Sequence, residues 1–142
     1  MFTIGRNTDY ASRIVLHLAC LEPGARVTAA DIASRRLIPP AFIRRIVSRL
    51  SAVGVLATVR GSGGGIALAR PAAQITLREV VEAFEGPLSL NVCVASPAVC
   101  PLAVTCPVQQ AWVGATQHLA AFLTGVTFGD LAREIRDPQS VP

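Results

Sequence analysis

The stretch that decides the fold of this chain is residues 39–68, PPAFIRRIVSRLSAVGVLATVRGSGGGIAL. The two prolines suit the first turn of a helix and Gly54 suits its exit, so we expect a helix over 39–53. Residues 55–59 and 66–69 have the apolar character of strands, and the glycine-rich segment between them suits a hairpin tip. The stretch therefore predicts a helix followed directly by a β-hairpin.

Two further helices are expected before this stretch. Apolar residues recur every three or four positions from about Thr8 to Leu21, and Thr28 is placed to cap a short helix that ends near Arg35. Three helices followed by a glycine-tipped hairpin form the winged helix-turn-helix pattern. The expected fold class is thus mainly α with a small β-hairpin.

Five segments are expected after the hairpin. The capping box TLRE at 76–79 predicts a helix as far as Gly86-Pro87. A proline-broken loop comes next, and then a helix over about 108–124 whose wide apolar stripe we interpret as a dimerisation surface. The predicted organisation is a winged helix-turn-helix DNA-binding domain at 1–86, a cysteine loop for cluster binding at 87–107, a long C-terminal dimerisation helix with a short last helix at 108–136, and a disordered tail at 137–142.

Charge is distributed unevenly along the chain. The net charge is +4, yet residues 1–78 carry +8 and residues 79–142 carry −4. Every basic side chain is an arginine. A basic N-terminal half beside an acidic C-terminal half indicates that one end of the protein meets a polyanion.

The outward face of the helix at 39–53 carries side chains that suit nucleic acid. Arginine binds phosphates or guanine edges, and serine can contact either. Arg60 stands at the base of the hairpin tip, whose glycines allow the backbone to approach phosphates closely. An ordinary solvated helix face is the alternative interpretation. The predicted DNA-contacting residues are Arg44, Arg45, Ser48, Arg49, Arg60, Ser62 and Gly63.

Three of the four cysteines lie in the proline-broken loop, at Cys93, Cys100 and Cys106. Thiolates are soft ligands for zinc or for iron–sulfur clusters. Structural zinc sites usually place two cysteines two to four residues apart, and this loop has no such pair. The spacing favours an iron–sulfur cluster, and three buried apolar thiols are the alternative. The fourth cysteine, Cys20, is interpreted as core packing.

A resemblance to a known family rests on several of these motifs together. The run LATVRGSGGG at 56–65, TLREVV at 76–81, EGP at 85–87 and the cysteine loop resemble, in the same order, the IscR/NsrR family of winged-helix regulators. The resemblance implies a homodimer that binds palindromic, double-stranded promoter DNA and carries a [2Fe–2S] or [4Fe–4S] cluster that sets DNA affinity. It makes the helix at 39–53 the recognition helix and Arg60 the wing arginine.

This chain departs from the family pattern at two positions. Ile66 stands where the family often has an aromatic residue, and Arg44 stands where some members have an acid. The operator sequence therefore does not carry over from the family.

The resemblance also bears on the fourth cluster ligand. Some members use a histidine three residues after the last cysteine, where this chain has Gln109. Others use an acidic residue near the start of the first helix, supplied by the partner subunit, and Asp9 matches that position. The alternative role for Asp9 is electrostatic stabilisation of the helix N-terminus. His17 and His118 are interpreted as partly buried helix residues, so the predicted ligands of the metal cofactor are Cys93, Cys100, Cys106 and Asp9.

The sequence thus predicts a dimeric transcriptional regulator that senses redox state, nitric oxide or iron through an iron–sulfur cluster. A cluster-free winged-helix repressor that uses thiol switching is the alternative. An electron-transfer protein would not need the arginine surface, and no Ser/His/Asp set or paired carboxylates indicate an enzyme. The most apolar region, 88–113, is broken by three prolines, so we expect no membrane span and a cytoplasmic protein with reduced thiols.

Overall fold

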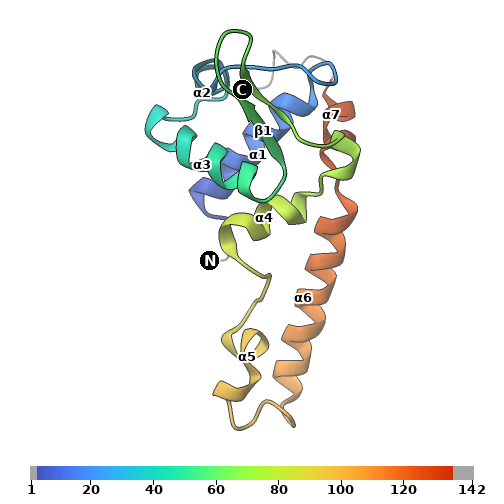
Figure 1. Cartoon of the computed structure of the whole chain (residues 1–142). Helices are drawn as coiled ribbons and strands as arrows, with labels where there is room; N and C mark the ends of the chain where they lie inside the picture. Colours follow the sequence, from blue (N-terminus) through green and yellow to red (C-terminus); the bar gives the residue numbers. More distant parts are fainter. Residues whose placement is uncertain (1–2, 136–142) are drawn as a thin grey trace.

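The computed structural model describes residues 3–135 of the chain. The disordered tail expected at 137–142 lies outside the described residues. Within them, helices dominate and two strands form an antiparallel hairpin, which confirms the expected fold class. Figure 1 shows a winged-helix part from which one long helix extends downward.

The winged-helix part begins with three helices. These are α1 (Arg6–Ala19), α2 (Ala29–Arg35) and α3 (Pro40–Ala52). The Thr28 hydroxyl accepts a hydrogen bond from the Asp31 amide and caps α2, as expected. Pro40 occupies the first turn of α3, where its missing N–H costs nothing.

The hairpin consists of β1 (Leu56–Val59) and β2 (Gly65–Leu68), with Leu56 opposite Leu68 in the register. A single bridge between Val27 and Ile66 attaches the segment before α2 to the outer side of β2. This bridge places the wing beside the start of α2.

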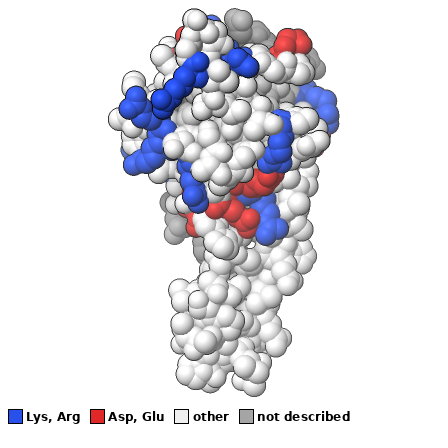
Figure 2. Space-filling view, viewed as in Figure 1, with Lys and Arg blue, Asp and Glu red and all other residues white. Residues whose placement is uncertain are grey.

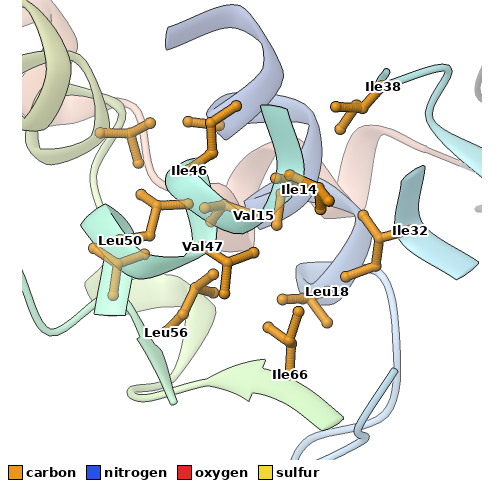
Figure 3. Close-up of a cluster of buried hydrophobic side chains, with 14 of the residues drawn as sticks. Ile14, Val15, Leu18, Ile32, Ile38, Ile46, Val47, Leu50, Leu56 and Ile66 are labelled. Carbon is orange, nitrogen blue, oxygen red and sulfur yellow. The ribbon is translucent and has the colours of Figure 1, made fainter. Parts of the chain in front are cut away.

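One apolar core lies between α1, α2, α3 and the hairpin. Figure 3 shows Ile14 and Val15 of α1 facing Ile46, Val47 and Leu50 of α3. Ile14, Val15, Ile46 and Leu50 are all fully buried, and each buried aliphatic side chain of this size contributes about 1.5–3 kcal/mol to folding. This core holds α3 with its other face outward.

Helix α4 (Leu77–Glu85) follows the short turn η1 (Ala72–Gln74) and packs against α1. The predicted capping box is present, because Thr76 Oγ1 accepts from the Glu79 amide and the Glu79 carboxylate accepts from the Thr76 amide.

The cysteine loop contains two short elements that the sequence did not predict, α5 (Val92–Ala95) and η2 (Pro97–Val99). Helix α6 (Pro107–Gly125) then runs back toward the winged-helix part, and α7 (Phe128–Glu134) packs against α1 and η1. Phe128 is 1% exposed and belongs to the same core. None of the helices in the described part of the chain is both long and apolar enough to span a membrane.

Candidate functional site

The exposed face of α3 carries three of the predicted DNA-contacting residues. Arg44, Arg45 and Ser48 are exposed, on the side of α3 opposite to its buried isoleucines and leucine. Nη2 of Arg45 donates to Asn7 Oδ1 at 3.2 Å, and its guanidinium lies 5.5 Å from the centre of the Phe42 ring. Arg45 is therefore already oriented by α1 and by its own helix.

Arg49 is exposed as well, but one of its donors is committed within the protein. Its Nε donates to the main-chain carbonyl of Ala83 at 2.7 Å. This hydrogen bond ties the C-terminal half of α3 to the end of α4. The structure thus gives Arg49 a role in positioning α3 that the sequence did not reveal.

The wing presents the other predicted residues at its tip. Arg60, Ser62 and Gly63 are exposed there, and Gly63 has φ of 74°, a conformation that favours glycine. A Cβ on Gly64 would lie 2.2 Å from the Val59 carbonyl oxygen, so only glycine fits this turn. The glycine run therefore sets the shape of the wing.

Sequence reasoning missed a second arginine at the wing. Nη1 of Arg26 donates to the Gly63 carbonyl at 3.3 Å. The Val27–Ile66 bridge brings Arg26 to this place, 37 residues away in sequence. Only its position in the basic half of the chain could have pointed to it.

The basic side chains gather on one part of the molecule. Figure 2 shows arginines spread over the winged-helix part, and no charged atoms on the visible face of the lower part formed by α5 and the adjoining turns of α6. The sequence agrees, because Glu85 and Asp130 are consecutive charged residues with none between them. A duplex attracted by phosphate charge would therefore meet the winged-helix part.

The uncharged lower part contains the three loop cysteines. We call residues 86–107 the cysteine module. Cys93 lies in α5, Cys100 follows η2, and Cys106 is the N-cap of α6. All three are half-buried free thiols. Cys106 therefore stands where the module meets the first turn of α6.

The donor set fits an iron–sulfur cluster in chemistry, since three thiols lie in one module with no charged side chain. The predicted ligands are not yet gathered in a single chain: across residues 3–135, no three His, Cys, Asp or Glu side chains form a group that could hold a metal ion.

Asp9 lies apart from this module in one chain. It is in the first turn of α1, and its carboxylate accepts from Arg13 Nη2 at 2.6 Å. Figure 1 places α1 in the winged-helix part and α5 at the far end of the molecule. The structure therefore shows the predicted stabilising position of Asp9 at a helix N-terminus, and any ligation by Asp9 needs a second chain.

The histidines behave differently from each other. His17 is 6% exposed, and its Nδ1 accepts from Arg36 Nε at 2.8 Å. Burial and the nearby Arg36 charge lower the pKa of His17. His118 is exposed, so its predicted partial burial was wrong, because it lies on a face of α6 where Ala115 and Phe122 are exposed as well. Cys20 ends α1 half-buried, and burial raises the pKa of its thiol.

Comparison with solved structures shows the same fold in known regulators. CymR (YrzC), the global cysteine regulator of B. subtilis, is 23% identical, with a TM-score of 0.78 over 95% of this chain and 99% of that one. The oxidized form of Staphylococcus aureus CymR is 21% identical, with a TM-score of 0.74 over 96% and 100%. T. potens IscR is 18% identical, with a TM-score of 0.76 over 99% and 93%.

A family model covers almost the whole described part of the chain. The Rrf2 model, described as iron-dependent transcriptional regulator, matches residues 4–134. This range includes α3, the wing, the cysteine module and α6. The chain therefore belongs to the Rrf2 family of transcriptional regulators.

Proposed function

We propose that the chain is a homodimeric regulator whose affinity for promoter DNA is set by an iron–sulfur cluster in the cysteine module. Membership of the Rrf2 family identifies the chain as a transcriptional regulator. The observation that carries the finer proposal is the pairing of two surfaces in one chain, an arginine-rich winged helix and an uncharged module with three half-buried thiols. A DNA-binding protein does not need the thiol module, and a cluster-binding protein does not need the arginine surface, so their presence in one chain supports a linked role.

The DNA contacts are assigned by exposure and chemistry. Helix α3 enters the major groove with Arg44, Arg45 and Ser48 toward the bases or the adjacent phosphates. Arg60 and the backbone of Ser62 and Gly63 reach the flanking phosphates or minor groove from the wing. Arg49 contributes through its terminal guanidinium nitrogens while its Nε holds α4. Arg26 adds a positive charge at the base of the wing.

The proposed homodimer forms through the outward face of α6, where a second copy of the chain packs. This helix has 19 residues without Asp, Glu, Lys or Arg. An exposed stripe runs along it at the spacing of a helix–helix seam, and Val108 and Phe122 in it are 60% and 67% exposed. The stripe consists of Val108, Ala111, Ala115, His118 and Phe122. Two copies joined along α6 bring two α3 helices to a palindromic site.

The cluster ligands are assigned to Cys93, Cys100 and Cys106 of one subunit and Asp9 of the partner subunit. A bound cluster would supply sensitivity to redox state, nitric oxide or iron supply. Asp9 Oδ2 pairs with Arg13 in α1, and α1 packs directly against α3. A change in ligation therefore reaches the recognition helix through α1.

The test is the visible absorption spectrum of anaerobically purified protein, with iron and sulfide counted per chain. The proposal predicts coloured protein with near-equal iron and sulfide. Cys93→Ala and Cys106→Ala should each lose the colour, and Cys20→Ala, the matched cysteine outside the module, should keep it. Wild-type protein that stays colourless after anaerobic reconstitution with iron and sulfide would refute the cluster.

A thiol switch without metal is the second candidate. Two observations favour it: the module thiols are partly accessible, and one similar structure is the oxidized form of Staphylococcus aureus CymR. Measurements of DNA binding in solution distinguish the two candidate mechanisms. Loss of regulation on treatment with an iron chelator under anaerobic, reducing conditions supports the cluster. Insensitivity to the chelator with sensitivity to a disulfide oxidant supports the thiol switch.

A further inference from the structure

The start of α1 and the end of α4 meet at the carboxylate of Glu85. Its Oε1 accepts from the Gly5 amide at 2.8 Å and from Thr8 Oγ1 at 2.5 Å. Gly5 is the N-cap of α1, Thr8 is 1% exposed, and Glu85 is the last residue of α4. The start of α1 is thus fastened to the end of α4, 80 residues away in sequence.

This contact performs a capping function that α1 does not provide for itself. In α4, the Glu79 carboxylate accepts from the N-cap amide of Thr76 at 2.8 Å, within the same helix. Helix α1 has no side-chain cap at Gly5. Glu85 supplies the equivalent carboxylate from another helix, at the positive end of the α1 dipole.

Gly5 also leaves the space that the carboxylate occupies. A Cβ at this position would lie 2.8 Å from Glu85 Oε1. The glycine and the glutamate therefore fit each other sterically as well as through the hydrogen bond.

Both sides of this junction lead directly to α3. On the α1 side, Asn7 Oδ1 accepts from Arg45. On the α4 side, the Ala83 carbonyl accepts from Arg49. Immediately after Glu85, Gly86 adopts φ of 80° and the cysteine module begins. A displacement at the root of the module thus acts on two arginine contacts of the recognition helix.

We propose that Glu85 is the positioning residue that couples the cysteine module to α3. This inference rests on the proposed function, because it names the route by which a change in the module reaches the DNA-binding face. Movement of the module root shifts Glu85, releases the N-cap of α1, and alters the Asn7–Arg45 and Ala83–Arg49 hydrogen bonds together. Within the described part of the chain, the hydrogen bonds of Glu85 go to Gly5 and Thr8 and not to the proposed cluster ligands.

The test compares DNA affinity of cluster-loaded and cluster-free protein for Glu85→Ala, Glu85→Gln and wild type. The probe is one duplex selected by the wild-type protein from random double-stranded DNA. Coupling between sites is typically about 5–150-fold. We expect Glu85→Ala to reduce the ratio of the two affinities by at least about threefold while the absorbance and iron content stay at wild-type values. Glu85→Gln keeps one acceptor oxygen, so its affinity ratio should lie between those of Glu85→Ala and wild type.

Glu22→Ala is the matched control, since Glu22 is an exposed carboxylate in the turn after α1. It should leave the affinity ratio unchanged. A purely structural role for Glu85 would weaken both forms equally and preserve the ratio, which would overturn the inference. Gly5→Ala and Thr8→Val reach the same contact from α1, so the inference remains testable if Glu85→Ala does not fold.

A second readout does not depend on the cluster. Amide hydrogen exchange in the first turn of α1 should accelerate in cluster-free Glu85→Ala protein and remain unchanged in Glu22→Ala. Unaltered exchange there would overturn the coupling route. If wild-type protein binds DNA equally with and without its cluster while this exchange does accelerate, the proposed function fails and the Glu85 contact stands.

Discussion

His17 and Arg36 form a buried pair beside the turn that leads into α3. Arg36 follows α2 directly, and Leu37 after it has φ of 55°, a left-handed conformation unusual for leucine. The neutral His17 ring accepts from Arg36, so this pair helps to fix the turn only while the ring is unprotonated. Nothing in the sequence predicts the pair, because its partners are 19 residues apart.

The pair predicts a fall in stability in mild acid. Burial, Arg36 and Arg35 lower the pKa of His17, and Asp31 opposes them. The unfolded chain takes up a proton below about pH 6.5 and the folded chain does not, so stability is complete above that pH and is lost as pH falls through the lowered pKa.

The variant His17→Asn should flatten this profile. The amide oxygen of asparagine can accept from Arg36 and does not titrate. We expect a smaller decrease in the free energy of unfolding between about pH 7 and pH 5 than in wild type, measured by urea denaturation. Gln117→Asn, at an exposed position outside the α6 stripe, is the control and should retain the wild-type slope. An unchanged slope in His17→Asn would contradict the assignment.

At the same scale, Arg44 and Arg60 should differ in how their loss affects binding. Loss of an arginine that bonds to a base costs about 1–3 kcal/mol of binding free energy and relaxes sequence preference. Loss of a phosphate contact weakens binding to all sequences and lowers the salt slope by about 1. We expect Arg44→Ala to show the first pattern and Arg60→Ala the second in salt titrations on matched and mismatched duplexes.

Arg133→Ala provides the control for these titrations, since Arg133 lies on α7 and pairs with Asp130. It should leave both affinity and salt slope close to wild type. Wild-type affinity in Arg44→Ala and Arg60→Ala would place the DNA on another face.

At the scale of elements, a local side-chain cap helped to predict where a helix begins. Thr28 and Thr76 cap α2 and α4 from within the same segment, and both helices begin where expected. Helix α1 begins at Arg6, two residues before the expected Thr8, because its cap comes from Glu85. The short α5 and η2 escaped prediction because four or fewer residues carry no periodicity.

Helix α6 gives the sharpest prediction at this scale. Phe122→Lys places a charge in the proposed seam and should convert a dimer to a monomer at micromolar concentration, as measured by analytical ultracentrifugation. Gln117→Lys puts the same charge on an exposed position outside the stripe and should leave the dimer intact. If Phe122→Lys protein remained dimeric, the dimer interface would have to lie on another face of the molecule.

At the scale of the whole molecule, the chain separates its charged side chains from the three thiols of the cysteine module. The arginines cover the winged-helix part, and the cysteine module with α6 is uncharged. The sequence showed this separation as a difference between its two halves. It did not show that α7 returns to the core through Phe128, or that the predicted ligands remain ungathered in one chain. Both depend on contacts between segments that are far apart in sequence.

Cluster-dependent DNA affinity is the property on which the proposed regulation rests. The most direct measurement is the dissociation constant for one selected duplex, at fixed salt, of the same preparation before and after anaerobic removal of iron. We predict that the two constants differ by at least about fivefold, and that Cys93→Ala protein shows only the value of the iron-free form. Equal constants for protein with a full cluster and protein without one would contradict the account.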